Sequence, residues 1–373
     1  MDFSLYIHYP FCLRKCHYCA FASIPVEAQA QNDFHQALLR ELIHRSAQSP
    51  WAGGTVTTLY FGGGTPSLAP VDFIAEVIAE VRARWNLAAD AEITLEANPT
   101  TAETKKFRAF REAGINRLSM GAQSFDDGEL QMLGRTHNST AIGDAVRFAR
   151  EAGFDNISLD LIYGAPGMTI ENLSRSVDKF LELNLEHLST YSLSIEPNTH
   201  FARIQKIDPK FQVDQDRTAD QFGLICKKMK LAGYEHYELT NFSRPGKHSR
   251  HNYNYWLRTP FLGLGVSAHS FDGRRRFWNN PNVAEYNQAI LKSHDAVAGS
   301  EDISAESERD EIVYLGLRCR EGLSVAFASE NLHTDIMKDL LSQGVLFIRE
   351  GKIHVLEHDW LLLDEIALRL LDG

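Results

Sequence analysis

The chain has 373 residues, of which 44% are hydrophobic and 23% charged, and its formal net charge is -11. This composition excludes an intrinsically disordered chain and is typical of a globular protein, while the length favours two domains over one core. The acidic balance argues against a nucleic-acid binder, which needs a basic stripe. The first residues lack the basic start and apolar run of a signal peptide, and no stretch reaches the ~18 apolar residues that span a bilayer. We therefore predict a cytoplasmic protein.

Short β-rich runs alternate with amphipathic helical patterns over the first two-thirds of the chain. We expect six strands, over Leu5–His8, Thr57–Phe61, Ile93–Ala97, Arg117–Gly121, Asn156–Ile162 and His187–Leu193. The predicted helices are Asp33–Ala47, Val71–Trp85, Thr104–Ala113, Thr140–Ala152, Ile170–Leu183 and Gln215–Ala232. Repeated βαβ units indicate a parallel sheet, and six units are too few for a closed eight-stranded barrel. The prediction is an α/β fold with an open, partial (β/α)6 barrel; a doubly wound sheet is the competing topology.

Polar residues sit at the ends of these strands, which favours the barrel. Cys12 follows the first strand and residues 62–65 follow the second; Glu96 closes the third, Gln123 follows the fourth, and Asp160 lies late in the fifth. Strand ends on one face are where α/β folds assemble their sites.

The remaining sequence changes character twice. Residues 1–240 would form the barrel domain, and residues 241–299, rich in aromatics, Gly, Asn and His, an extension that packs on it. Residues 300–373 begin with an acid-rich, exposed segment and predict a small winged-helix-like α+β domain. Its predicted elements are a helix over Arg309–Cys319, a helix over Thr334–Gln343, a hairpin over Val345–Leu356 and a helix over Trp360–Leu371. The net charge favours a packing or partner role for this domain over DNA binding.

Three of the five cysteines lie close together. Cys12, Cys16 and Cys19 have the spacing C-x3-C-x2-C, whereas Cys226 and Cys319 are isolated. An odd, clustered set indicates a metal site in a reducing compartment rather than a disulfide framework. Three thiolates can hold three irons of a [4Fe–4S] cubane, which leaves the fourth iron open to a ligand with oxygen and nitrogen donors.

A structural zinc knuckle is the alternative for this loop. Zinc needs a fourth ligand, which His8 or His17 could supply. Arg14 and Lys15 add positive charge beside the sulfurs and favour deprotonated ligands in either case.

The cysteine loop resembles that of the radical-SAM enzymes. C-x3-C-x2-C in the first strand-to-helix loop is their signature, and the flanking Tyr-x-His-x-Pro-Phe-Cys at residues 6–12 is similar to the coproporphyrinogen dehydrogenase-like branch. The resemblance extends over almost the whole chain. It implies that the open iron binds the amino and carboxylate groups of S-adenosylmethionine, and that an electron donor reduces the cluster.

The same resemblance implies further contacts with S-adenosylmethionine. The Gly-Gly-Gly-Thr-Pro loop at residues 62–66 is similar to the family's methionine-binding loop, although glycine also serves ordinary turns. Polar residues late in strands match other family positions, although an exposed strand end is the simpler alternative. The implied contacts are Tyr6, Tyr18, Phe21, Gly63, Gly64, Thr65, Glu96, Gln123, Arg135 and Asp160.

One position departs from the porphyrinogen-decarboxylating enzymes of this branch. They carry a fourth cysteine two residues after the third, where this chain has Phe21. This disfavours the dehydrogenase and resembles the haem chaperone subfamily instead. His17 and Ala20 differ from the Pro and Asp that are common in the chaperone loop.

A second string resembles the haem-binding motif of the chaperones. It reads H-N-x-x-Y-W over residues 251–256. Imidazole is a good axial ligand for haem iron, so His251 is the implied ligand, with His248 or His269 as substitutes. Tyr255 and Trp256 offer flat apolar surface. The alternative is an aromatic loop that packs over the barrel.

The sequence thus predicts a radical-SAM [4Fe–4S] protein that acts as a haem chaperone. Haem is its cargo, delivered to acceptor haemoproteins, in the family typically respiratory membrane proteins, which would bring the chain to the periphery of the inner membrane. We assign no catalytic residue. Two alternatives remain: an oxygen-independent coproporphyrinogen III dehydrogenase, and a zinc-stabilised binding protein.

Overall fold

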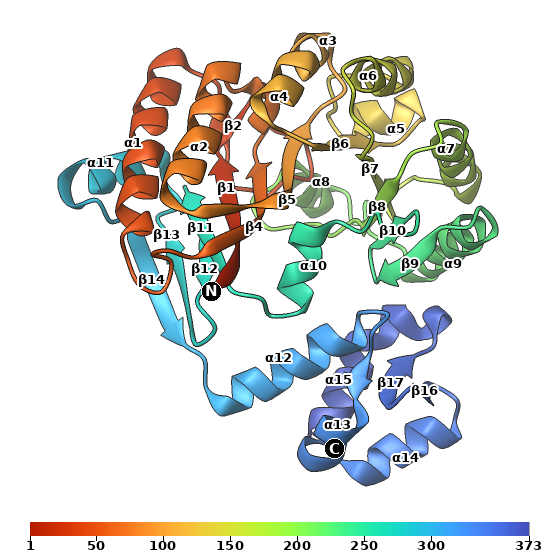
Figure 1. Ribbon diagram of the computed structural model, residues 1–373. Helices are drawn as coiled ribbons and strands as arrows, with labels where there is room; N and C mark the ends of the chain where they lie inside the picture. The colour runs from red at the N-terminus through yellow and green to blue at the C-terminus, as the bar shows by residue number, and fades with distance from the viewer. Residues whose placement is uncertain (373) are drawn as a thin grey trace.

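The computed structural model describes residues 1–372, without the side chains of Thr101 and Ala102. The last residue of the predicted C-terminal domain, Gly373, lies outside the described residues. Six parallel strands form the centre of the molecule (Figure 1). They are β1 (Asp2–Tyr9), β4 (Thr55–Gly63), β5 (Asn86–Ala97), β6 (Arg117–Gln123), β7 (Ile157–Tyr163) and β8 (His187–Ser192). All six predicted strands are confirmed, although β5 begins at Asn86 rather than Ile93.

Each strand pairs in parallel with the next along the chain, from β1 to β8. The two outer members, β1 and β8, are not neighbours in the sheet order, so the barrel stays open as predicted. The parallel register brings the carboxyl ends of the strands to one edge, where the polar strand-end residues gather.

Helices follow the strands and cover the outer face of the curved sheet (Figure 1). They are α1 (Ala28–Ser46), α2 (Val71–Arg84), α3 (Thr101–Thr104), α4 (Phe107–Ala113), α5 (Asp127–Met132), α6 (Ser139–Glu151), α7 (Ile170–Glu182), α8 (His200–Ile207) and α9 (Gln215–Leu231). Their apolar stripes complete the core; α2, for example, buries Phe73, Val77 and Val81, which lie on one helix face. The single helix predicted over Thr104–Ala113 is wrong, because the chain breaks it between α3 and α4.

Residues 241–299, predicted as an extension, add strands to both edges of the same sheet. At one edge β10 (Asn241–Ser243) pairs antiparallel with β8 and with β9 (Glu235–Glu238). At the other, β11 (Phe261–Gly265) pairs in parallel with β1. The sheet continues through β12 (His269–Phe271), β13 (Arg275–Asn279) and β14 (Val297–Asp302) to twelve strands. Helix α10 (Arg250–Trp256) connects β10 to β11 in the chain and contacts β4. Helix α11 (Val283–Ser293) follows β13 and packs against α1.

The C-terminal elements form a small unit with its own three-stranded sheet. They are α12 (Ala305–Leu317), β15 (Leu323–Ser324), α13 (Val325–Asn331), α14 (Thr334–Ser342), β16 (Leu346–Arg349), β17 (Lys352–Val355), the 3-10 helix η2 (Glu357–Leu362) and α15 (Leu363–Asp372). The predicted hairpin is confirmed: β16 and β17 are antiparallel, and Glu350 and Gly351 turn with positive φ, as a two-residue hairpin requires. The unit lies beside β9 and α10 (Figure 1).

Candidate functional site

The three clustered cysteines lie on the loop that follows β1. The short strands β2 (Phe11–Cys12) and β3 (Ile24–Pro25) pair in parallel and close the base of this loop. A backbone hydrogen bond of 3.1 Å from Val26 to the Cys12 carbonyl strengthens that closure, and the Cys19 amide donates to the Cys16 carbonyl at 3.3 Å. These backbone hydrogen bonds hold the loop in a fixed turn, and its sulfurs lie near the carboxyl ends of the strands.

Both histidines that could complete a zinc site serve to anchor the loop. His17 places Nδ1 2.8 Å from the Met132 carbonyl, and its ring lies over Gly134, where a Cβ would come within 2.8 Å of the ring. His8 places Nε2 2.9 Å from the Ala22 carbonyl, and its Nδ1 lies 3.2 Å from the Tyr6 hydroxyl. Neither ring is directed at the sulfurs.

The sulfur positions also distinguish a cluster from a single zinc ion. The three Sγ atoms do not all lie within 4.8 Å of one another. Thiolates on one tetrahedral zinc sit about 3.8 Å apart, given Zn–S bonds of about 2.3 Å. A cubane instead holds each cysteine on a different iron, which needs a wider spacing. The arrangement of Cys12, Cys16 and Cys19 therefore fits a cluster better than zinc.

The glycine-rich loop after β4 packs against the cysteine loop. The Gly64 amide donates to the Tyr9 carbonyl and the Thr65 amide to the Phe11 carbonyl, each at 2.8 Å. A Cβ on Gly64 would lie only 2.7 Å from the Phe11 carbonyl oxygen, so the close approach requires glycine. The Thr65 hydroxyl lies 3.5 Å from Cys12 Sγ.

Arg135 joins the cysteine loop to the ends of two further strands. One guanidinium nitrogen donates to Cys16 Sγ at 3.3 Å, and the other donates to the Gly121 carbonyl at 2.7 Å and to Asn98 Oδ1. A guanidinium beside a thiol favours the thiolate that iron binds.

Two carboxyl groups line the same pocket from β5 and β7, the strands on either side of β6. Glu96 accepts hydrogen bonds from the Tyr60 hydroxyl at 2.8 Å and the Gly63 amide at 3.0 Å. Burial raises the pKa of Glu96 to about 7 and that of Asp160 to about 6. Both carboxyls therefore titrate near neutrality, which is a common property of functional sites.

A cavity of about 490 Å³ joins these groups at the strand ends. Predicted residues that line it are Cys12, Cys16, Tyr18, Cys19, Phe21, Gly63, Gly64, Thr65, Glu96, Gln123, Arg135 and Asp160. Tyr6 is not in the lining and contacts His8 behind it. The lining also includes residues that we did not predict as contacts: Asn98, Ser119, Tyr191 and Glu196. Their positions at or beyond the ends of β5 and β8, or within β6, could have signalled them.

His251, the predicted haem ligand, does not reach this cavity. It lies on α10, toward the amino-terminal parts of the strands, and its side chain is buried. Its Nδ1 lies 2.8 Å from the Thr58 hydroxyl and its Nε2 2.9 Å from the Tyr255 hydroxyl. Burial lowers the pKa of His251 to about 3, so the ring is neutral at physiological pH. Both ring nitrogens are engaged in this conformation, and neither is free for iron.

The two alternative histidines have different surroundings. His248 stacks on Tyr237, with ring centroids 4.1 Å apart, and its Nε2 lies 3.1 Å from Glu235 Oε2. His269 is exposed on β12, and its ring stacks on Trp278 with centroids 5.6 Å apart. The structure therefore does not bring the three histidines together.

Known proteins match this chain over nearly its whole length. The profile of the Radical SAM superfamily matches residues 6–180. The chain is 32% identical over 371 residues to the Heme chaperone HemW of Bacillus subtilis, covering 97% of both chains. It is 40% identical over 267 residues to the Heme chaperone HemW of Escherichia coli, covering 71% of this chain and 69% of that one. The chain belongs to the heme chaperone HemW family.

Among solved structures, coproporphyrinogen III oxidase (HemN) from Escherichia coli, a radical SAM enzyme, matches with a TM-score of 0.85 and 26% identity. The match covers 99% of this chain and 89% of that chain. The predicted family and fold class are confirmed. Family membership also implies a [4Fe–4S] cluster and S-adenosylmethionine. Within residues 1–372, none of the helices combines the length and hydropathy that crossing a bilayer requires.

Proposed function

We propose that this chain is a haem chaperone, which binds haem and passes it to acceptor haemoproteins. The observation that carries the proposal is similarity to Heme chaperone HemW proteins over almost the full chain. Phe21 supports it, because an apolar ring stands where the decarboxylating relatives carry a cysteine. The Phe21 side chain is 67% exposed at the cavity and offers no ligand atom.

In this proposal Cys12, Cys16 and Cys19 hold the cluster, which supplies an electron when reduced by a donor protein. S-adenosylmethionine fills the rest of the cavity. Its sulfonium group is a cation, and the Glu96 and Asp160 carboxyls would provide the opposite charge. Tyr6, which lies outside the cavity lining, acts by orienting His8. The remaining cofactor contacts are Tyr18, Phe21, Gly63, Gly64, Thr65, Gln123 and Arg135.

His251 remains our candidate axial ligand for haem. Its ring is neutral, which is the form that binds iron. Ligation through Nε2 requires loss of the Tyr255 hydrogen bond and a shift of α10 away from β4. His269 is the substitute that needs no such shift, since its ring is already exposed.

The same proposal covers the partners and the division of the chain. The acceptors include respiratory membrane proteins. The chaperone is cytoplasmic and reaches them at the periphery of the inner membrane. Nucleic acid takes no part in this function. Residues 1–240 form the cofactor domain, residues 241–299 carry the haem site, and residues 300–373 cover the site or dock a partner.

A second function, oxygen-independent oxidation of coproporphyrinogen III, is favoured by one observation. The match to HemN extends over 99% of this chain with a TM-score of 0.85. Against it stands Phe21, and we therefore rank it second.

One experiment separates the two functions. The full chain is purified without oxygen, its cluster is reconstituted, and haem is titrated with and without S-adenosylmethionine. Haem-loaded protein is then mixed with a haem-free acceptor, and transfer is followed in the Soret region. We expect one tight haem site and transfer to the acceptor. The parallel assay supplies coproporphyrinogen III, S-adenosylmethionine and a reductant; catalytic formation of protoporphyrinogen, or failure to bind haem, would overturn the chaperone proposal.

A further inference from the structure

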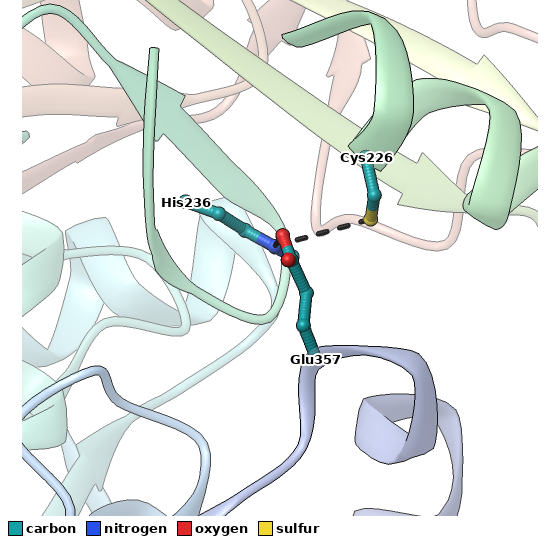
Figure 2. Close-up of side chains that lie close together, drawn as sticks. All are labelled: Cys226, His236 and Glu357. Carbon is teal, nitrogen blue, oxygen red and sulfur yellow. Dashed lines mark hydrogen bonds and ion pairs between the residues drawn. The ribbon is translucent and has the colours of Figure 1, made fainter. Parts of the chain in front are cut away.

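A second group of metal-ligand side chains lies far from the cysteine loop. Cys226 comes from α9, His236 from β9, and Glu357 from the first turn of η2 in the C-terminal unit, and all three point to one spot (Figure 2). One sulfur, one ring nitrogen and one carboxylate oxygen all lie within 4.8 Å of one another. Among the described residues, no other triplet of His, Cys, Asp and Glu side chains meets that spacing.

We propose that Cys226, His236 and Glu357 bind a zinc ion that joins the barrel to the C-terminal unit. The observed distances are near those of a tetrahedral site. His236 Nδ1 lies 3.9 Å from Cys226 Sγ and 2.9 Å from Glu357 Oε1. Standard zinc bond lengths place a nitrogen–sulfur pair about 3.6 Å apart and a nitrogen–oxygen pair about 3.4 Å apart. Each of the two observed distances therefore differs from this value by about half an ångström or less.

The His236 ring is prepared to present Nδ1 to a metal. Its other nitrogen, Nε2, lies 3.2 Å from the Leu239 carbonyl, so Nε2 donates there and Nδ1 faces the other two ligand atoms. The ring stacks on Phe242 with centroids 4.0 Å apart and contacts Trp360 at 4.3 Å. These neighbours fix the ring plane, which lowers the entropy cost of binding an ion.

The same geometry excludes a nucleophilic triad. A Cys–His–carboxylate relay needs the two ring nitrogens to face different partners, one the thiol and the other the acid. Here Nδ1 faces both Cys226 and Glu357, while Nε2 faces a backbone carbonyl. A shared ion accounts for this arrangement, whereas proton transfer through the ring does not.

The donor set favours zinc over the commoner divalent cations. Magnesium and calcium prefer oxygen ligands, whereas a thiolate, an imidazole and a carboxylate together suit zinc. Three protein ligands leave a fourth position for water. The His236 side chain is 7% exposed and that of Glu357 35%, so a small ion and a water molecule can reach the site from the Glu357 side.

A zinc ion at this site would link two parts of the fold, because Cys226 and His236 belong to the barrel and Glu357 to the C-terminal unit. The C-terminal unit also contacts β9 through an ion pair between Arg318 and Glu238 at 3.1 Å. A metal bond to Glu357 would add a further attachment, at the start of the segment that leads into α15.

The test uses the full chain with its cluster reconstituted, and zinc as the probe. X-ray absorption at the zinc edge reports only zinc, so iron in the cluster does not interfere. We expect about one zinc per chain, with one sulfur neighbour and the rest nitrogen or oxygen. Cys226→Ser, His236→Gln and Glu357→Gln should each weaken zinc binding more than about a hundredfold and leave iron content unchanged.

The matched control is Cys319→Ser, which changes the other isolated buried cysteine and should keep wild-type zinc affinity. Zinc should also raise the thermal unfolding midpoint of wild type and Cys319→Ser but not of the three ligand variants. Equal zinc affinity in wild type and His236→Gln, or a zinc spectrum with three sulfurs, would overturn the proposal. Because iron and haem are measured separately, this failure would be distinct from failure of the chaperone function.

Discussion

The cofactor pocket and the α10 region differ in what their side chains leave available. The three cysteines of the pocket are only partly buried and border a cavity of about 490 Å³. His251 on α10 is buried, with both ring nitrogens hydrogen-bonded. In sequence, both regions resemble ligand-binding motifs of the family. The comparison teaches that a motif indicates which atoms suit a ligand, whereas burial and hydrogen bonding decide whether those atoms are free to bind it.

The largest effect should come from removing one cluster ligand. Cys16→Ala should abolish the cluster, because two cysteines cannot hold the cubane, and iron, sulfide and the brown absorbance should all be lost after anaerobic reconstitution. Haem binding should persist if haem sits in the α10 region. Cys319→Ala is the control and should keep the cluster. Full iron content in Cys16→Ala would place the cluster elsewhere and remove the contrast between the two regions.

The next effect concerns His251 and tests whether α10 can open. His251→Ala should weaken haem binding about tenfold or more and shift the Soret band, while the cluster spectrum stays intact. Tyr255→Phe removes the hydrogen bond to Nε2 at a cost of about 1 kcal/mol in stability. This variant should therefore bind haem more tightly than wild type. Unchanged haem affinity in both variants would move the ligand to His269 or His248.

A moderate effect on stability is expected at Arg135. Arg135→Gln leaves the Gly121 carbonyl and Asn98 Oδ1 without their charged donor, which should lower the free energy of unfolding by about 2 kcal/mol. Arg147→Gln is the control, since that side chain is 52% exposed and solvent screens its ion pairs. Urea denaturation of the two variants measures the difference. Equal losses would mean that Arg135 is not a structural element of the pocket.

The smallest effect should be a pH dependence centred on Glu96. Burial raises its pKa from 4.5 to about 7, so the folded chain holds this proton more tightly than the unfolded chain does. The resulting stability is fully present below pH 4.5 and is lost as the pH rises through about 7. Glu96→Gln should remove this dependence, so its stability relative to wild type should increase between pH 5 and pH 8 by up to about 2 kcal/mol. A stability difference that does not vary with pH would contradict the shifted pKa.

Much of the barrel could be predicted from local sequence. Runs such as Leu5–His8 and Thr57–Phe61 are short and bounded by turn residues, and their alternation with amphipathic helical stretches indicates a parallel sheet. The break between α3 and α4 escaped prediction, because helical periodicity continues across residues 104–107. The short helix α10 was also missed, since its aromatic sequence has weak intrinsic helix propensity and is held by contacts with β4 and β5.

For the pocket, the spacing of the cysteines and the polar residues at strand ends indicated many of the side chains that line the cavity, but not Ser119, Tyr191 or Glu196. Parallel pairing requires successive strand ends to meet at one edge, so residues from β1 to β8 reach a common cavity. The role of His17 could not be predicted in this way. Its partner, the Met132 carbonyl, lies at the end of α5, and nothing in the local sequence signals that contact.

By itself, the sequence determined the order of strands and helices, the cluster ligands and the family, because these depend on periodicity and on residues close together in the chain. Only the tertiary structure decided that His251 is enclosed by Thr58 and Tyr255, and that Cys226 and His236 meet Glu357. The contacts of His251 with Thr58 and of His236 with Glu357 join residues more than a hundred positions apart, and they form only when α10 packs against β4 and the C-terminal unit packs beside β9.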